Sequence, residues 1–164
     1  GGMLVTNNKD LYKRAHELTD GSSTPSARHI APASDLQAAL GLSQLRRYPD
    51  FIDRRNKLRQ IYTEAAQRFS IRIGAPVKSN MLFRFTLKTN DRFESVQSKF
   101  LDQGVSVRRG VDELLHRILG LNDSSYPVAT QLYHETVSVP FYPSLSNEEA
   151  VVVSNAFRVI KNAH

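Results

Sequence analysis

Apolar side chains in the first part of the chain recur at the spacing of an amphipathic helix. We expect this helix at Lys9–Thr19, with Asn8 as its N-cap. Residues 1–7 are apolar and β-branched enough to predict a short strand before it. Residues 21–32 are rich in Gly, Ser and Pro and show no periodicity, which predicts a loop. The residues that define the helix face are Leu11, Ala15 and Leu18.

Residues 34–69 predict a pair of long helices with a break between them. Ser34 and Gln37 have the spacing of a capping box, which marks the start of the first helix. Pro49 lies within the apolar periodicity and should kink or restart the helix. Together the two helices would approach about 50 Å in length, so we expect them to reach another domain or subunit. The apolar positions include Leu36, Leu40, Leu45, Phe51, Ile52, Leu58 and Ile61.

The second half of the chain alternates predicted strands with predicted helices. Strands are expected at residues 81–87, 105–108 and 136–141, and alternation along the first places Phe83 and Phe85 on the face that packs in the core. Helix starts are predicted at Asp91, Pro127 and Ser146, with Glu149 completing a capping box and Gly104 and Gly120 ending helical segments.

The pattern therefore predicts an α/β (α+β) fold. A long kinked helix pair precedes a small sheet of three or four strands with helices packed on it. We divide the chain into residues 1–33 (strand, helix and loop), residues 34–69 (long connecting helices) and residues 70–164 (small α/β domain).

Composition narrows the classes of function. The 164 residues carry a net charge of +6, but Lys and Arg are spread along the helices, so we do not expect nucleic-acid binding. No apolar run is long enough for a membrane helix, and no signal-peptide pattern is present. Cysteine is absent, which fits a cytoplasmic protein.

Few residues suggest chemistry. No His pair has the spacing of metal ligands, and no glycine-rich loop follows a predicted strand, so no metal site is expected. Arg108 and Arg109 follow a predicted strand, where two guanidinium groups could bind a phosphate or carboxylate of a substrate. The alternative is that they face solvent on opposite sides of the strand, held by Asp112 or Glu113. Glu148 and Glu149 are explained by helix capping.

Three segments, in this order, resemble the DegT/DnrJ/EryC1/StrS family of sugar aminotransferases, which depend on pyridoxal phosphate (PLP). The resemblance covers nearly the whole chain, and Arg54-Arg55 also falls where that family carries two arginines. The segments are Gly1-Gly2-Met3 with Val5-Thr6-Asn7, Ser34-Asp35-Leu36-Gln37-Ala38-Ala39 with Gln44-Leu45, and Ser138-Val139-Pro140 with Tyr142-Pro143-Ser144-Leu145-Ser146.

The resemblance implies the small carboxyl-terminal domain of a fold-type I aminotransferase. It also implies that the Schiff-base lysine precedes Gly1-Gly2, so no catalytic or cofactor-binding residue is expected in this chain. The family usually has Tyr-Asn-Tyr-Arg-Met before Ser34, where the Asn reaches the cofactor phosphate of the neighbouring subunit. Here Ile30 and Pro32 replace the Asn and the Arg.

Two functional hypotheses remain open at this point. In the first, the chain is the carboxyl-terminal portion of an enzyme that transfers an amino group, for example from glutamate, to a keto-sugar nucleotide. That portion would be inactive and free of PLP by itself, and the resemblance implies a homodimer. In the second, the chain is a non-catalytic relative that acts as an interaction module, which Ile30 and Pro32 favour.

Overall fold

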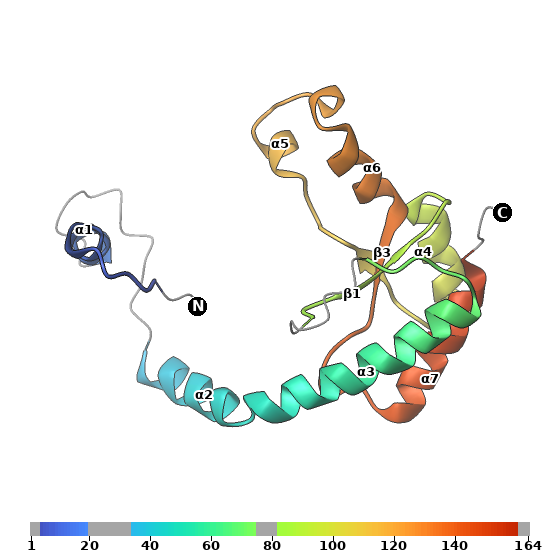
Figure 1. The fold of residues 1–164 in the computed structure, drawn as a ribbon, viewed down its shortest axis with the longest axis horizontal. Coiled ribbons are helices and arrows are strands. Elements are labelled where there is room, and N and C mark those ends of the chain that lie inside the picture. The colour runs from blue at the N-terminus through green and yellow to red at the C-terminus, as the bar shows by residue number, and fades with distance from the viewer. Residues whose placement is uncertain (1–3, 20–33, 75–81, 161–164) are drawn as a thin grey trace. The chain divides into compact units, whose positions relative to one another are not determined.

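The computed structural model describes residues 4–19, 34–74 and 82–160. The chain divides into two compact units, Gly1–Tyr48 and Pro49–His164. Figure 1 shows the helices and strands with the labels used below.

The described part of the first unit contains helices α1 and α2, and both begin where the sequence predicts. Helix α1 spans Lys9–Thr19, and the Asn8 Oδ1 atom accepts hydrogen bonds from the N–H groups of Asp10 (2.9 Å) and Leu11 (3.2 Å). Helix α2 spans Asp35–Arg46, and its capping box between Ser34 and Gln37 is complete.

The short strand predicted at residues 1–7 does not form in the part that the structure describes. Leu4 and Val5 lie exposed before α1 without regular secondary structure. Strand geometry needs a hydrogen-bonded neighbour, and none of the described residues supplies one there.

The second unit starts with the predicted helix restart at Pro49. Helix α3 spans Tyr48–Arg68, which places Pro49 in its first turn, where the missing N–H has no intrahelical partner to lose. The remaining helices are α4 (Phe93–Leu101), α5 (Leu115–Ile118), α6 (Pro127–Glu135) and α7 (Asn147–Ala156). Short 3-10 turns lie at Asp123–Ser125 and Phe157–Val159.

Among the described residues, three strands form one antiparallel sheet in the order β1-β3-β2. They are β1 (Phe85–Lys88), β2 (Arg108–Arg109) and the central β3 (Thr136–Val139). Phe85 pairs with Val139, and Arg108 pairs with Ser138. A mixed α/β fold with a small sheet and packed helices was the prediction, and it is confirmed.

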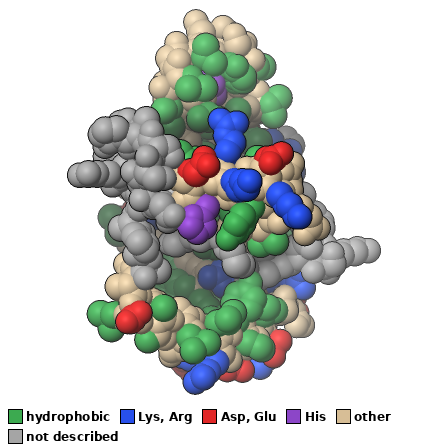
Figure 2. All heavy atoms as spheres, turned by 90° about the vertical axis from the view of Figure 1, so that its left-hand side faces the viewer, with side chains coloured by type: hydrophobic (Ala, Val, Ile, Leu, Met, Phe, Trp, Pro, Cys, Tyr) green, Lys and Arg blue, Asp and Glu red, His purple; other side chains and the backbone are tan. Residues whose placement is uncertain are grey.

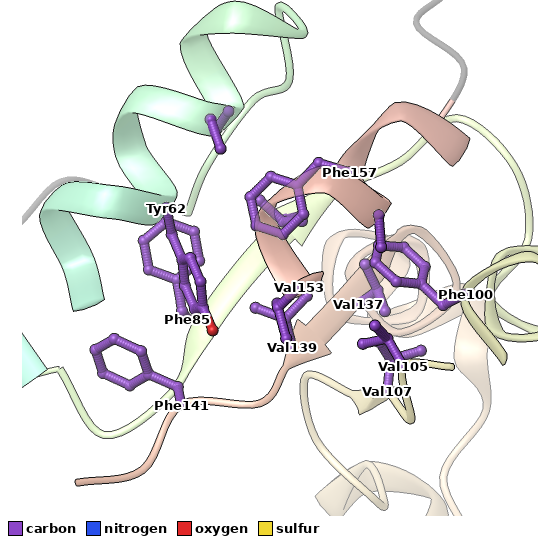
Figure 3. Close-up of a cluster of buried hydrophobic side chains, with 14 of the residues drawn as sticks. Tyr62, Phe85, Phe100, Val105, Val107, Val137, Val139, Phe141, Val153 and Phe157 are labelled. Carbon is purple, nitrogen blue, oxygen red and sulfur yellow. The ribbon is translucent and has the colours of Figure 1, made fainter. Parts of the chain in front are cut away.

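The core fills the space between the sheet and helices α3, α4 and α7 (Figures 1 and 3). Its centre is Tyr62 of α3, whose ring lies 5.3 Å from that of Phe85 and 5.6 Å from that of Phe157. The Tyr62 hydroxyl donates to the Pro140 carbonyl oxygen at 2.9 Å, and burial raises the pKa of this hydroxyl. Aromatic packing of this kind stabilises a core beyond the area that it buries.

Two local predictions were wrong. Phe83 is 71% exposed, whereas Phe85 is buried, because β1 begins only at Phe85. Asp91 does not cap α4, since Arg92 occupies the N-cap position and no side chain bonds there. The Asp91 carboxylate pairs with Lys99 at 2.5 Å instead. Gly104 ends α4 with φ of +73°, as its predicted C-terminal position requires.

Candidate functional site: a basic cleft at the sheet edge

Arg108 and Arg109 are neighbours in β2, and strand geometry sends their side chains to opposite faces of the sheet. Arg109 is largely enclosed, with its guanidinium carbon 4.3 Å from the ring centroids of both Phe93 and Tyr133. It donates to the Tyr133 carbonyl oxygen at 3.0 Å and pairs with Glu94. The pKa of Glu94 is lowered, first by a backbone hydrogen bond and then by the Arg109 charge. These contacts give Arg109 a role in joining α4, β2 and α6.

Arg108 lies in a different environment. Its side chain is exposed and lines a cleft of about 840 Å³. Within residues 4–19, 34–74 and 82–160 the Arg108 guanidinium has no hydrogen-bond or ion-pair partner, although the Arg108 backbone pairs with Ser138. The two arginines that the sequence suggested as a pair are therefore not brought to one place, and Arg108 is the one that a ligand in the cleft can reach.

The cleft contains two more arginines, from α3 and from the segment before β1. Arg55 donates to the carbonyl oxygens of Leu82 (3.0 Å) and Phe83 (2.8 Å), and its guanidinium lies 5.5 Å from the Phe141 ring. Arg84 donates to the Arg109 carbonyl oxygen at 3.2 Å. The guanidinium carbons of Arg55 and Arg84 each lie 5.9 Å from the centroid of the exposed Phe83 ring.

Arg54 precedes Arg55 but serves a structural purpose. Its guanidinium donates to the Leu145 carbonyl oxygen and, at 2.8 Å, to Asn147 Oδ1. These bonds connect α3 to the start of α7, which carries the predicted capping box between Ser146 and Glu149. The Arg54-Arg55 dipeptide thus binds two segments to α3, the one that precedes α7 and the one that precedes β1.

Sequence analysis missed a polar cluster between α5 and α6. His116 is 6% exposed, stacks on Tyr126 at 4.6 Å, and shares a 2.9 Å hydrogen bond with Asp123 Oδ1. Arg117 donates to both carboxylate oxygens of Asp123, at 2.9 and 2.7 Å. These bonds lower the pKa of Asp123, with Arg117 as the largest cause and His116 as the second. Arg117 and Asp123 are six residues apart, a spacing that no helix pattern singles out.

Hydrophobic side chains surround this cluster on the surface. They can be seen at the top of Figure 2, where the α5–α6 region lies. Below this region, an apolar cavity of about 530 Å³ separates α6 from the sheet, with Gly110, Leu87 and Leu132 in its wall. The exposed apolar residues of the region include Leu115, Ile118, Leu119, Leu121, Val128 and Leu132.

Some expectations concern residues outside the described ranges. Ile30 and Pro32, which replace the family's Asn and Arg, belong to this group, as does the loop expected at residues 21–32. In the described part of the chain, no cluster of His, Cys, Asp or Glu has the arrangement of a metal site. No helix in those same ranges is long and apolar enough to cross a membrane.

A small antiparallel sheet with helices α3, α4 and α7 packed on it is a fold that solved aminotransferases share. The apo form of Spr1654 from Streptococcus pneumoniae, provisionally described as a sugar aminotransferase, superposes with a TM-score of 0.77 at 21% identity. The match covers 96% of this chain and 44% of that one. This likeness establishes the fold.

The sequence establishes the family. The model of the DegT/DnrJ/EryC1/StrS aminotransferase family matches residues 1–158, and the chain belongs to this family. It is 31% identical to the erythromycin biosynthesis sensory transduction protein EryC1 of Saccharopolyspora erythraea, over 92% of this chain and 44% of that protein. It is 24% identical to the GDP-perosamine synthase of Escherichia coli O157:H7, over 93% of this chain and 45% of that protein.

The resemblance inferred from the three sequence segments is thereby confirmed. The chain spans about half the length of the curated relatives that it matches.

Proposed function

We propose that this chain is the carboxyl-terminal portion of a PLP-dependent aminotransferase that acts on a keto-sugar nucleotide, with an amino acid such as glutamate as the amino donor. The observation that carries the proposal is the family match across residues 1–158. The similarity to a GDP-perosamine synthase supports a nucleotide-sugar substrate, and Spr1654 has been solved in a PLP form.

Two described lysines of the second unit, Lys88 and Lys99, have carboxylate partners. When bound, PLP supplies an electron sink, and it is held through an amine that must be free to attack a carbonyl carbon. Lys99 is paired with Asp91 at 2.5 Å, and Lys88 lies 3.6 Å from Glu135. None of the lysines of this chain stands at the position that the family resemblance gives to the Schiff-base lysine, so we propose that the isolated chain binds no PLP covalently and transfers no amino group.

We further propose a homodimer in the cytoplasm. Helix α2 supports the dimer because it buries none of its residues, although four leucines lie along it. Uncovered leucines at this density are typical of a surface that contacts another chain or domain. The four residues are Leu36, Leu40, Leu42 and Leu45.

The second candidate function is a non-catalytic family member that acts as an interaction module. The replacement of the family's Asn and Arg by Ile30 and Pro32 favours it, because neither side chain can hydrogen-bond a phosphate. The same exposed α2 leucines would then serve the partner.

The two candidate functions can be distinguished by testing the product of the whole natural reading frame. The frame that includes Met3 should be expressed in full beside the present chain, and both should be treated with PLP and borohydride before intact-mass analysis. We expect one trapped adduct in the full product and none in the present chain. Nitrogen from labelled glutamate should then appear on a keto-sugar nucleotide only with the full product.

Each outcome has a clear meaning. A full product without a PLP-binding lysine, or one that binds PLP but transfers no nitrogen to any keto-sugar nucleotide tried, supports the interaction module. A stoichiometric adduct at a single lysine of the present chain contradicts the proposal that this portion lacks the Schiff-base residue.

A further inference from the structure

Residues 111–135, which contain α5 and α6, contribute little to the hydrophobic core. We call this part of the chain the arm, and Figure 1 shows it at the top of the picture, where it extends away from the sheet. The buried side chains of the core all lie within residues 58–107 and 137–160. In the arm, which the structure describes throughout, only Leu114 and His116 are buried, whereas Leu115 is 69% and Ile118 is 62% exposed.

Apolar packing between the arm and the sheet is incomplete. The cavity of about 530 Å³ lies between them, with Leu114 and Leu132 on the side of the arm and Ile73 and Leu87 on the side of the sheet. A side chain that lines open space makes fewer dispersion contacts than one packed on every side. Apolar contacts therefore do little to hold the arm against the sheet.

The arm has contacts of its own that do not depend on the core. Arg117 donates to both carboxylate oxygens of Asp123, and His116 shares a hydrogen bond with the same carboxylate. His116 also stacks on Tyr126, and its carbonyl oxygen accepts a hydrogen bond from the Leu121 N–H at 2.8 Å. Because each of these contacts joins one residue of the arm to another, the arm can move without breaking them.

The two ends of the arm lie close together at the sheet. A methyl group added to Gly110 would lie 3.0 Å from the Thr136 side-chain methyl carbon, so the backbones that enter and leave the arm are adjacent. At this base the Thr89 N–H donates to the Glu135 carbonyl oxygen at 2.8 Å. A narrow base of this kind lets the arm move as one body through small changes in few backbone angles.

Arg109 provides the strongest link between the arm and the rest of the second unit. Its side chain is 16% exposed, and its guanidinium carbon lies 4.3 Å from the rings of Phe93 in α4 and of Tyr133 in the arm. The same guanidinium donates to the Tyr133 carbonyl oxygen and pairs with Glu94 of α4. Charged hydrogen bonds and cation–π contacts from a side chain with little exposure are strong for their kind.

The ion pairs that join the arm to β1 and to the residue before it are weaker. Asp112 lies 3.8 Å from Arg84 and is 70% exposed, and Glu135 lies 3.6 Å from Lys88. Long ion pairs at partly exposed positions contribute little to stability. The link through Arg109 therefore has no equal among the described contacts of the arm with the sheet and α4.

We propose that the arm opens from the sheet as one unit while the core stays folded, and that Arg109 is the residue that holds it closed. Regions with few buried apolar contacts open locally at a lower free energy than the core. Opening would expose Leu87 and Ile73, which line the cavity beneath the arm. The inference holds for either of the two functions, because it rests on contacts within the second unit.

The test is native-state hydrogen exchange of the full chain, followed by mass spectrometry at low urea concentrations. The Thr130 N–H of α6 bonds to the Tyr126 carbonyl oxygen, and the Ala150 N–H of α7 bonds to the Ser146 carbonyl oxygen. We expect amides of α6 to exchange at least about tenfold faster than those of α7, relative to their rates in an unfolded chain. The arm exposes little surface when it opens, so its exchange should depend only weakly on urea.

Two variants of Arg109 test its role. Arg109→Gln should raise the exchange of α6 amides about tenfold or more and leave α7 amides unchanged, since it removes contacts that the core does not share. Arg109→Lys keeps the charge but loses the planar group, so it should give a smaller increase, and it serves if the first variant does not fold. The control Lys99→Gln breaks the ion pair with Asp91 in α4 and removes an equal charge, and it should leave α6 exchange unchanged.

A second measurement uses the absence of cysteine from the sequence. In a Leu114→Cys variant the thiol lies beside the cavity beneath the arm, and in Val96→Cys it lies in the core. Adding Arg109→Gln should speed the reaction of the Leu114→Cys thiol with an alkylating reagent about tenfold. The same addition should not change the rate for Val96→Cys.

Three results would overturn the proposal. If α6 and α7 amides exchange with one free energy and one urea dependence, the arm and the core form a single cooperative unit. If Arg109→Gln raises exchange equally in α6 and α7, Arg109 stabilises the whole unit and does not control the arm. If Lys99→Gln speeds α6 exchange as much as Arg109→Gln does, the effect comes from the charge of the unit and not from the contacts of Arg109.

Discussion

Helices α2 and α7 start in the same way and end in opposite environments. Each has a Ser N-cap and a capping box, completed by Gln37 in α2 and by Glu149 in α7. Helix α7 buries Ala150, Val153 and Ala156 against the sheet, whereas α2 buries none of its residues. Capping therefore determines where a helix begins. Whether that helix contributes to a hydrophobic core depends on the apolar surface against which it packs.

The largest difference between α2 and the helices of the core should appear when a leucine is shortened to alanine in each. Leu58 of α3 is fully buried, and Leu40 of α2 is 62% exposed. Leu58→Ala should destabilise the second unit by about 2–5 kcal/mol, since it removes buried methyl groups and leaves a cavity. Leu40→Ala should change the unfolding free energy by less than about 0.5 kcal/mol. Urea denaturation of both variants measures this, and an equal cost at Leu40 would show that α2 is packed in solution.

The second largest effect should be on the self-association of the chain. If the exposed leucines of α2 contact a second copy, Leu40→Glu combined with Leu45→Glu should weaken the dimer at least about tenfold, because the pair places two charges in an apolar contact. Sedimentation equilibrium across a concentration series measures the dimer constant. The urea midpoint of the second unit should stay unchanged.

The matched control adds the same two groups at polar positions of α2. Ser43→Glu with Gln44→Glu carries equal bulk and charge, and we expect wild-type association. A wild-type chain that remains monomeric at high concentration, with no binding of a dye for exposed apolar surface, contradicts the homodimer of the isolated chain.

Helix starts could be predicted from sequence because their causes are local. Asn8, Ser34, Pro127 and Ser146 each act within three residues of the position that they mark, and all four mark a helix in the structure. Asp91 had the same pattern and failed, because its carboxylate pairs with Lys99. A lysine eight residues away competes with capping, and no short motif reports that.

The cleft was less predictable because its parts are distant in sequence. The alternation of side chains along the predicted strand separates the face of Phe83 and Phe85 from the face of Arg84. It cannot show that the pairing of this strand with β3 stops at Phe85. Phe83 is therefore exposed beside Arg55, which lies 28 residues earlier. In the same way, Arg109 is held by Glu94 and Tyr133, 15 and 24 residues away, and not by its near neighbours Asp112 and Glu113.

A smaller effect on stability is expected when the two capping boxes are each broken by the same substitution. Ser146→Ala should lower the unfolding free energy of the second unit by about 1 kcal/mol, since the Glu149 N–H loses its acceptor. Ser34→Ala removes the matching bond in α2, but it should leave the main unfolding transition unchanged because α2 is not part of the core. Thermal and urea unfolding followed by circular dichroism would record both. Equal losses of unfolding free energy in the two variants would show that α2 unfolds cooperatively with the second unit.

The smallest effect on stability should come from Asp123 of the α5–α6 polar cluster, whose side chain is exposed. The hydrogen bonds of Arg117 and then His116 lower the pKa of Asp123, so the folded state favours its ionised form. The resulting stabilisation is present above the ordinary carboxyl pKa of about 4 and is lost as pH falls through the lower folded value. Asp123→Asn should remove this acid dependence, so the urea midpoints of wild type and variant converge in acid. Asp102→Asn, at the exposed end of α4, serves as the control, and an identical acid response in both variants would contradict the assignment to Asp123.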